Sequence, residues 1–270
     1  MSPKDTLPGP VERLLRRDKS FVLAAVVVIV ALAGLYTVMG VGMDMSAFDM
    51  TRMASGDAMA MDVKWSPSYG MLVFFMWWVM MIAMMTPSAA PALLLYAAVK
   101  RLGPETTRAT GLTLWFLLGY LLVWAGFSLL ATGLQWALAQ IGLMNEALMT
   151  LNSRVIAGGI LLTAGLFQFS GLKNACLSHC QSPASFLASH NRPGMPGALR
   201  LGACHGAYCL GCCWALMALL FVGGIMNLWW IVGLALYVLA EKTLPHVRWL
   251  PRGTGALLLG AGGYFVLTGL

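Results

Sequence analysis

Cysteine and histidine are concentrated in two short segments of a chain that is otherwise largely apolar. Seven residues make up the two groups: Cys176, His179, Cys180, His205, Cys209, Cys212 and Cys213. Thiols and imidazoles at this density are typical of soft-metal binding or of thiol redox chemistry. Polar groups in a membrane-length apolar segment usually face the protein interior and carry a function.

The second segment places its donors along one stripe of a helix. At 100° per residue, His205, Cys209 and Cys212 fall within an arc of about 60°. His205 and Cys212 are also about 10 Å apart along the axis, so one ion cannot be held by the whole stripe. The remaining donors are expected from three places: the 176–180 cluster, Met84 or Met85, and Met217.

The first segment has the spacing of a compact cluster. Cys176, His179 and Cys180 stand at i, i+3 and i+4, so they converge if this stretch is helical. Pro183 follows shortly and would close such a turn. Glu241, at the end of an apolar run, is a further candidate because it could offset an ion's charge or take a proton released by a thiol. The alternative role for Glu241 is an interfacial anchor.

Methionine suggests which soft metal is involved. Met76, Met80 and Met84, at i, i+4 and i+8, cover about 80° of arc and ~12 Å of rise, and we interpret them as a sulfur ladder along one helix. Residues 43–62 also interleave methionine with aspartate, a combination suited to capturing a soft cation. Thiolate and thioether donors favour copper(I), whereas thiolate with imidazole also suits zinc. Copper(I) is therefore the expected metal, with zinc as the alternative, although methionine at helical spacing also serves as ordinary packing.

Composition places the chain in the membrane class. Of its 270 residues, 59% are hydrophobic and only 10% are charged, against roughly 25% charged in soluble domains. We expect an all-α transmembrane bundle that occupies residues 20–270 as one domain, behind a basic cytoplasmic segment at residues 1–19. The seven expected spans are 20–40, 70–98, 111–140, 154–172, 204–222, 225–241 and 254–270.

Lysine and arginine set the expected orientation. Fourteen of the 17 basic residues fall on the N-terminal segment or on the loops after the second, fourth and sixth spans. The positive-inside rule then places the N-terminus in the cytoplasm. The seven thiols and imidazoles lie on that reducing side, where structural disulfides are not expected. Ala31-Leu-Ala33 resembles a signal-peptidase site, but the apolar run continues to Met39, so we expect the first span to be retained.

Other functions are considered against this one. Cys209-Leu-Gly-Cys212 is also a CxxC pair, so a membrane thiol–redox protein is the main alternative. Haem ligation by His179 or His205 would leave the thiols without a role, and a structural subunit of a membrane complex would not need them. The sequence contains no nucleotide loop, paired catalytic carboxylates or nucleophile triad, which favours a binding or transfer protein over an enzyme. It also contains no basic patch interleaved with aromatic residues, as nucleic-acid binding requires.

Three blocks of the sequence resemble a bacterial family of predicted metal-binding integral membrane proteins. The blocks are MWWVMMIAMMTPSAAP at 76–91, GLKNACLSHCQSP at 171–183, and HGAYCLGCCWALM at 205–217, followed by GIMNLWW and AEKTLP. The resemblance covers about residues 70–245. It implies a helical membrane protein of the bacterial inner membrane with a metal site on the seven thiols and imidazoles. The expected partners are the lipid bilayer and a metallochaperone or metalloenzyme client.

Overall fold

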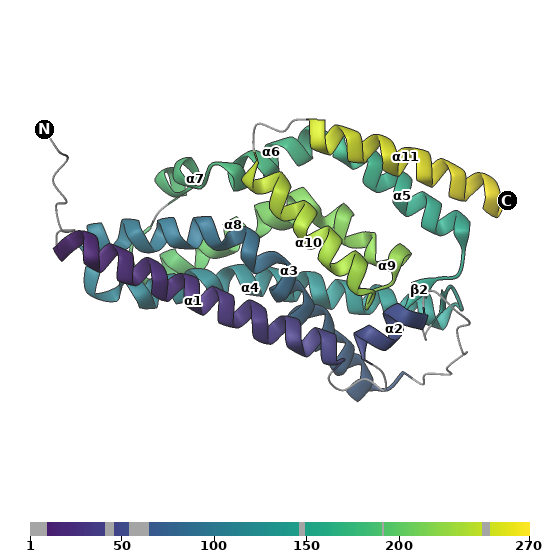
Figure 1. Ribbon diagram of the computed structural model, residues 1–270, viewed down its shortest axis with the longest axis horizontal. Coiled ribbons are helices and arrows are strands. Elements are labelled where there is room, and N and C mark those ends of the chain that lie inside the picture. The colour runs from purple at the N-terminus through teal and green to yellow at the C-terminus, as the bar shows by residue number, and fades with distance from the viewer. Residues whose placement is uncertain (1–9, 41–45, 54–64, 146–148, 191, 245–248) are drawn as a thin grey trace, which may run out of the picture.

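The computed structural model is a bundle of α-helices with one very short hairpin. It describes residues 10–40, 46–53, 65–145, 149–190, 192–244 and 249–270. The helices are α1 (Pro10–Met39), α2 (Ala47–Met53), α3 (Pro67–Leu102), α4 (Ala109–Gln140), α5 (Arg154–Gln168), α6 (Gly171–Gln181), α7 (Pro183–His190), α8 (Gly194–Ala218), α9 (Leu220–Gly223), α10 (Leu228–Thr243) and α11 (Trp249–Gly269). A short 3₁₀ helix, η1 (Thr106–Arg108), precedes α4, and strands β1 (Met144–Asn145) and β2 (Thr150–Leu151) pair antiparallel. The all-α expectation is confirmed (Figure 1).

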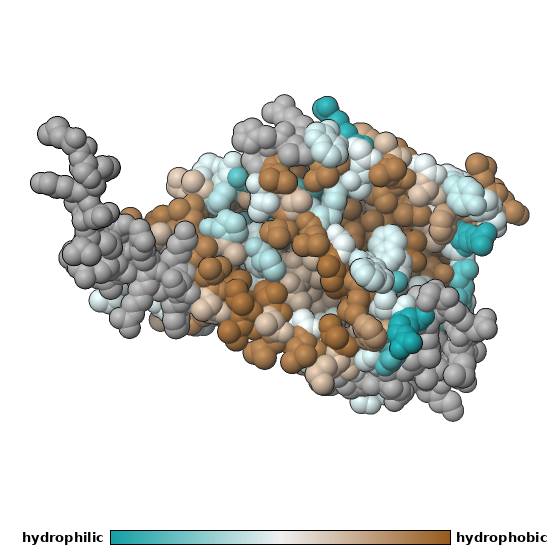
Figure 2. Space-filling model, viewed as in Figure 1, coloured by the Kyte–Doolittle hydropathy of each residue, from teal (hydrophilic) through white to brown (hydrophobic). Residues whose placement is uncertain are grey.

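Three helical stretches are long and apolar enough to cross a membrane: Pro67–Leu102, Thr106–Gln140 and Gly194–Gly223. The pair α5 and α6 forms a fourth if it is counted as one bent span. Large apolar side chains lie exposed on the outside of the bundle, for example Leu130 at 73% and Trp229 at 81%. Apolar residues also form a broad band across the visible face of the molecule (Figure 2). This surface fits contact with lipid.

The core of the bundle is formed by α3, α4 and α8, and α1 packs along α3 (Figure 1). α4 and α8 approach so closely that glycine is needed on both helices. A Cβ atom at Gly202 would overlap the carbonyl oxygen of Phe116, and one at Gly119 would overlap the carbonyl oxygen of Leu199. Small residues allow such backbone contact between membrane helices. The close approach fixes the position of α8, the helix that carries four of the six cysteines.

The expected fourth span, residues 154–172, is broken near its end, and the chain continues as a second helix. α5 ends at Gln168, and Ser170 caps a new helix, α6, by accepting a hydrogen bond from the Lys173 backbone N–H at 3.1 Å. The two helices differ in direction by 64°. The cluster expected in a loop therefore lies on a helix, which is the condition under which its side chains converge. α6 ends at Gln181, and Pro183 begins α7.

Several boundaries differ from the sequence-based expectation. α8 begins at Gly194, ten residues before the expected span at 204–222, and it continues into α9 after a short break. Pro87 and Pro91 both lie inside the single helix α3. Most of the methionine- and aspartate-containing segment at 43–62 lies outside the described residues; of this segment the structure describes α2 and the flanking Ser46. The backbone N–H at the start of α10 donates to Thr51 of α2.

Candidate metal centre

The two cysteine segments meet at the contact between α6 and α8. Cys176 packs directly on Gly211, where an added Cβ atom would lie 2.8 Å from its sulfur. One helical turn further along α6, the side chain of Cys180 lies close enough to Cys212 of α8 for the two thiols to interact. The sulfurs of the first segment thus face those of the second across the interface between the helices.

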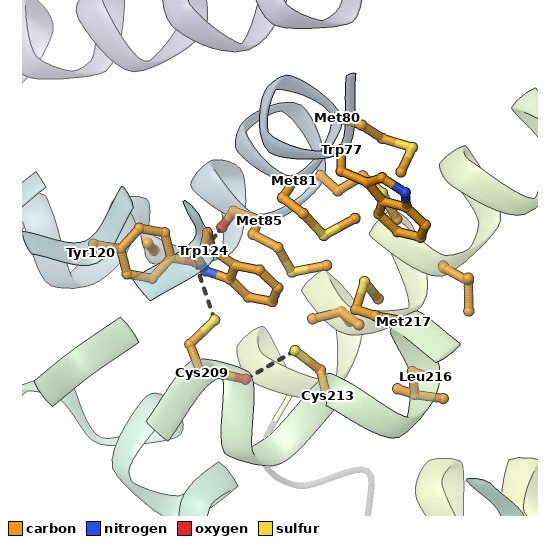
Figure 3. Close-up of a cluster of buried hydrophobic side chains, with 14 of the residues drawn as sticks. Trp77, Met80, Met81, Met85, Tyr120, Trp124, Cys209, Cys213, Leu216 and Met217 are labelled. Atoms are coloured by element: carbon orange, nitrogen blue, oxygen red, sulfur yellow. Dashed lines mark hydrogen bonds between the residues drawn. The ribbon is translucent and has the colours of Figure 1, made fainter. Parts of the chain in front are cut away.

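Cys209 lies in the interior of the bundle, 1% exposed, among polar groups from three other helices. Lys242 of α10 donates from Nζ to the Cys209 sulfur at 2.8 Å and to the Ser88 hydroxyl of α3 at 3.0 Å. The Tyr120 hydroxyl of α4 is 3.1 Å from the same sulfur and donates to the Met85 carbonyl oxygen at 3.0 Å (Figure 3). This sulfur therefore has an ammonium group and a phenol within hydrogen-bonding distance.

Cys212 and Cys213 are also buried and complete a row of thiols along α8. Their sulfurs donate to the Cys209 carbonyl oxygen at 3.1 and 2.9 Å. The Cys213 side chain therefore lies close to both Cys209 and Cys212. Cys180, Cys212, Cys213 and Cys209 together are called the thiol row.

Methionine side chains lie next to the thiols of α8. Met81 and Met85 of α3 and Met217 of α8 lie around the thiol of Cys213 (Figure 3). All three are fully buried, as are Met76, Met80 and Met84 of the expected ladder. In Figure 3 Met80 lies beside Trp77, whereas Met81 and Met85 lie nearer to the cysteines. The ladder through Met76, Met80 and Met84 stays a prediction.

The two histidines of the clusters lie in different surroundings. His205 is 3% exposed and is surrounded by the rings of Phe116, Tyr120 and Phe186, with centroids 5.5–5.9 Å away. Its Nδ1 has no hydrogen-bond partner among the described residues. His179 is half-buried, its ring stacked on Tyr208 with centroids 4.1 Å apart. Its Nδ1 is 2.8 Å from the Ala175 carbonyl oxygen. Tyr120 packs against the His205 ring and also contacts the Cys209 sulfur, so its side chain lies between these two residues.

Glu241, the acidic candidate, is held by a buried lysine. Lys173 Nζ donates to both carboxylate oxygens, at 2.8 and 2.9 Å, and also to Gln168. The Tyr237 hydroxyl donates to Oε1 of the same carboxylate at 2.6 Å. In this arrangement Glu241 neutralises Lys173, and it would have to leave that pair to reach a metal ion. Its role as a metal ligand stays a prediction.

Within the described ranges, no three cysteine, histidine, aspartate or glutamate side chains are arranged so that they could hold one metal ion. The thiols therefore offer pairs of donors rather than a closed cage. The remaining cysteine, Cys204, lies apart from the row and lines a polar hollow of about 130 Å³ with Arg192 and Arg200. It provides a natural control for the others.

The sequence model of the PpoB2 family, described as a copper chaperone, matches residues 74–265. The chain belongs to this family. The match includes all six cysteines and extends further toward the C-terminus than the expected core at 70–245. No curated protein and no solved structure matches the chain. For this PpoB2-family protein, the family description supports copper handling, and the arrangement of the sulfurs comes from the structure alone.

The candidate centre also includes groups that the sequence alone did not indicate. Tyr120 and Lys242 contact the Cys209 sulfur, Ser88 accepts a hydrogen bond from Lys242, and Met81 lies beside the cysteines. A polar residue in the middle of an apolar helix is the one signal that could have identified Tyr120 and Ser88. The contact with Lys242 joins residues 33 positions apart, and helical periodicity carries no information about it.

Proposed function

We propose that this protein is an integral membrane protein that binds copper(I) between the thiols of α6 and α8 and passes it to a partner. The observation that supports the proposal most directly is the row of thiols at Cys180, Cys212, Cys213 and Cys209 beside buried thioethers. Copper(I) accepts few ligands and prefers soft sulfur donors, so a pair of thiols with a neighbouring thioether is sufficient. The family description as a copper chaperone points in the same direction.

The proposed topology has seven spans, with the N-terminus in the cytoplasm of a bacterial inner membrane. α1, α10 and α11 supply the spans beyond the three long apolar stretches and the bent pair α5–α6. In this orientation the thiols lie in the cytoplasmic half, where they stay reduced. Copper would be captured by residues 43–62 outside, move along Met76, Met80 and Met84, and be held by the thiols. A metallochaperone or a metalloenzyme is the proposed recipient.

Copper(I) binding by single-cysteine variants tests the proposal. The full-length protein, purified under reducing conditions, is titrated with copper(I) against a chromophoric copper(I) chelator. We expect Cys209→Ser and Cys212→Ser to lower the affinity by at least about tenfold, because each removes one of very few soft donors. Cys204→Ser is the matched control, since this thiol lies on the same helix but apart from the row, and it should bind as the wild type does.

Two outcomes would contradict the proposal. Wild-type protein that binds no copper(I) under these conditions would exclude the assigned site. Differential alkylation addresses the thiol–redox alternative directly. A Cys209–Cys212 disulfide that opens and closes with an added reductant, in protein that retains no copper, would support redox chemistry instead.

A further inference from the structure

Lys242 is a buried cation whose polar contacts are with the candidate metal centre. It is 6% exposed, and its ammonium group donates to the Cys209 sulfur and to the Ser88 hydroxyl. The neighbouring carboxylate of Glu241 is already paired with Lys173. In the part of the chain that the structure describes, the ion pairs are Lys173–Glu241 and Lys100–Glu105, so no carboxylate pairs with Lys242.

A buried charge without an opposite charge is strongly unfavourable. Ser88 and Tyr120 are uncharged hydrogen-bonding groups, and Met85 contributes only a carbonyl oxygen to this network. The groups that can balance the ammonium are therefore the thiols of the row, with Cys209 in direct contact at 2.8 Å. The net charge of the metal centre must accordingly be counted with Lys242 included.

We infer that Lys242 makes the centre selective for a monovalent metal ion over a divalent one. This inference rests on the proposed copper(I) site and adds the residue that determines its charge preference. A thiol that coordinates a metal is deprotonated, so two coordinating cysteines contribute two negative charges. One of these is balanced by the Lys242 ammonium and the other by a monovalent ion, which leaves the buried centre neutral.

A divalent ion bound by the same two thiolates would leave one excess positive charge in apolar surroundings. A third thiolate would remove that excess, but no three such donors among the described residues are arranged around one point. At a separation of roughly 5 Å and an effective dielectric constant of about 20, one extra unit charge beside the ammonium corresponds to on the order of 100-fold in affinity. Lys242 therefore disfavours zinc at a site whose thiols would otherwise accept it.

Silver(I) and cadmium(II) are suitable probes, because both are soft, redox-inert ions and they differ in charge. The wild-type protein should bind silver(I) and copper(I) at the thiol row, and Lys242 should lower its affinity for cadmium(II) and zinc(II) relative to these ions by on the order of 100-fold. Lys242→Gln removes the charge, keeps a hydrogen-bond donor and adds no sulfur ligand. It should raise the affinity for cadmium(II) relative to silver(I) by on the order of 100-fold. Lys242→Arg keeps the charge and should retain the wild-type ratio.

The ratio of affinities separates this inference from the proposed function. If the wild type binds neither copper(I) nor silver(I), the copper site itself is wrong. If it binds them and Lys242→Gln leaves the ratio of cadmium(II) to silver(I) unchanged, the copper site stands and the role of Lys242 is overturned. Should neutral variants fail to fold, the wild type still decides the question. Cadmium(II) binding to it as tightly as silver(I), lost in Cys209→Ser, would refute charge selection.

Discussion

Lys173 and Lys242 are both buried lysines, and they differ in what balances their charge. Lys173, next to the break between α5 and α6, donates to the Glu241 carboxylate and the Gln168 amide. The carboxylate balances the charge of the ammonium group, so this network is neutral. Lys242 has a hydroxyl and a cysteine sulfur. Glu241, the partner of Lys173, is adjacent to Lys242 in the sequence, yet one helix step of 100° sends the two side chains into different networks. We therefore expect the network of Lys173 to stabilise the fold and the network of Lys242 to serve metal binding.

The largest effect is expected from breaking the network of Lys173. Glu241→Gln leaves the Lys173 ammonium buried without a counter-charge, which should cost about 3–5 kcal/mol of stability. The double variant Lys173→Met/Glu241→Leu removes both charges and should lose considerably less, since apolar replacements of a buried pair are often well tolerated. Thermal unfolding of the detergent-solubilised protein measures both variants.

The same variants test whether the two networks are independent. If the double variant folds, its copper(I) affinity should equal that of the wild type, because Cys209 and Lys242 keep their contacts. Equal destabilisation by the single and double variants would show that charge pairing is not what Glu241 contributes. Loss of copper binding in a well-folded double variant would instead restore Glu241 as a candidate ligand.

The difference between the two lysines also shows what the sequence could reveal. The spacing of Cys176, His179 and Cys180 predicted that the three converge if this stretch is helical, and the stretch forms α6, with Cys176 and Cys180 facing α8. Spacing of this kind is local and can be read from one sequence, and a joint site for the three residues stays a prediction. The prediction that 176–180 lies in a loop was wrong, because Ser170 caps a new helix after only two non-helical residues.

The partners of Glu241 and Lys242 could not be predicted in the same way. Glu241 was expected either to assist a metal or to anchor the helix at the interface. Their burial depends on where α3, α6 and α8 pack against α10, which is decided by contacts between residues 33 to 154 positions apart. Helical periodicity in one sequence does not contain those contacts.

A smaller effect is expected at Gly119, where α4 packs closely against α8 but contributes no side chain to the metal centre. An alanine methyl group at Gly119 would overlap the Leu199 carbonyl oxygen and lie 2.9 Å from the Ala203 nitrogen, whereas nothing lies within 4 Å of the same position at Gly111. Gly119→Ala should therefore cost about 1–3 kcal/mol through overpacking. Gly111→Ala, in the same helix, should be neutral or slightly stabilising because alanine favours helix.

The copper(I) affinity of Gly119→Ala tests whether the packing of α4 against α8 also positions the metal centre. Tyr120 neighbours Gly119 and contacts the Cys209 sulfur, so a displaced α8 should weaken copper(I) binding as well as stability. If Gly119→Ala changes stability alone, the metal centre tolerates movement between α4 and α8. Unchanged stability would contradict the close approach of the two helices.

The smallest effect is expected from a third lysine pair, in which the carboxylate of Glu105 is partly exposed to solvent. Lys100 Nζ donates to Glu105 at 2.6 Å, and the Gly194 backbone N–H at the start of α8 donates to the other carboxylate oxygen at 2.9 Å. The hydrogen bond from Lys100, followed by that from Gly194, lowers the pKa of Glu105 below its usual value of 4.5. Because the folded-state pKa is lowered, the pair stabilises the protein above about pH 4.5 and ceases to do so as the pH falls through the lowered value.

Glu105→Gln isolates this contribution. The difference in thermal midpoint between the wild type and the variant should be small at about pH 7 and should shrink toward zero as the pH falls through the lowered pKa of Glu105, below which both side chains are neutral. A Glu105 side chain left partly in solvent is screened, so its pair should contribute far less than Lys173–Glu241. If the two pairs proved equally important, burial would not be what separates them. The contrast drawn between Lys173 and Lys242 would then have to rest on their partners alone.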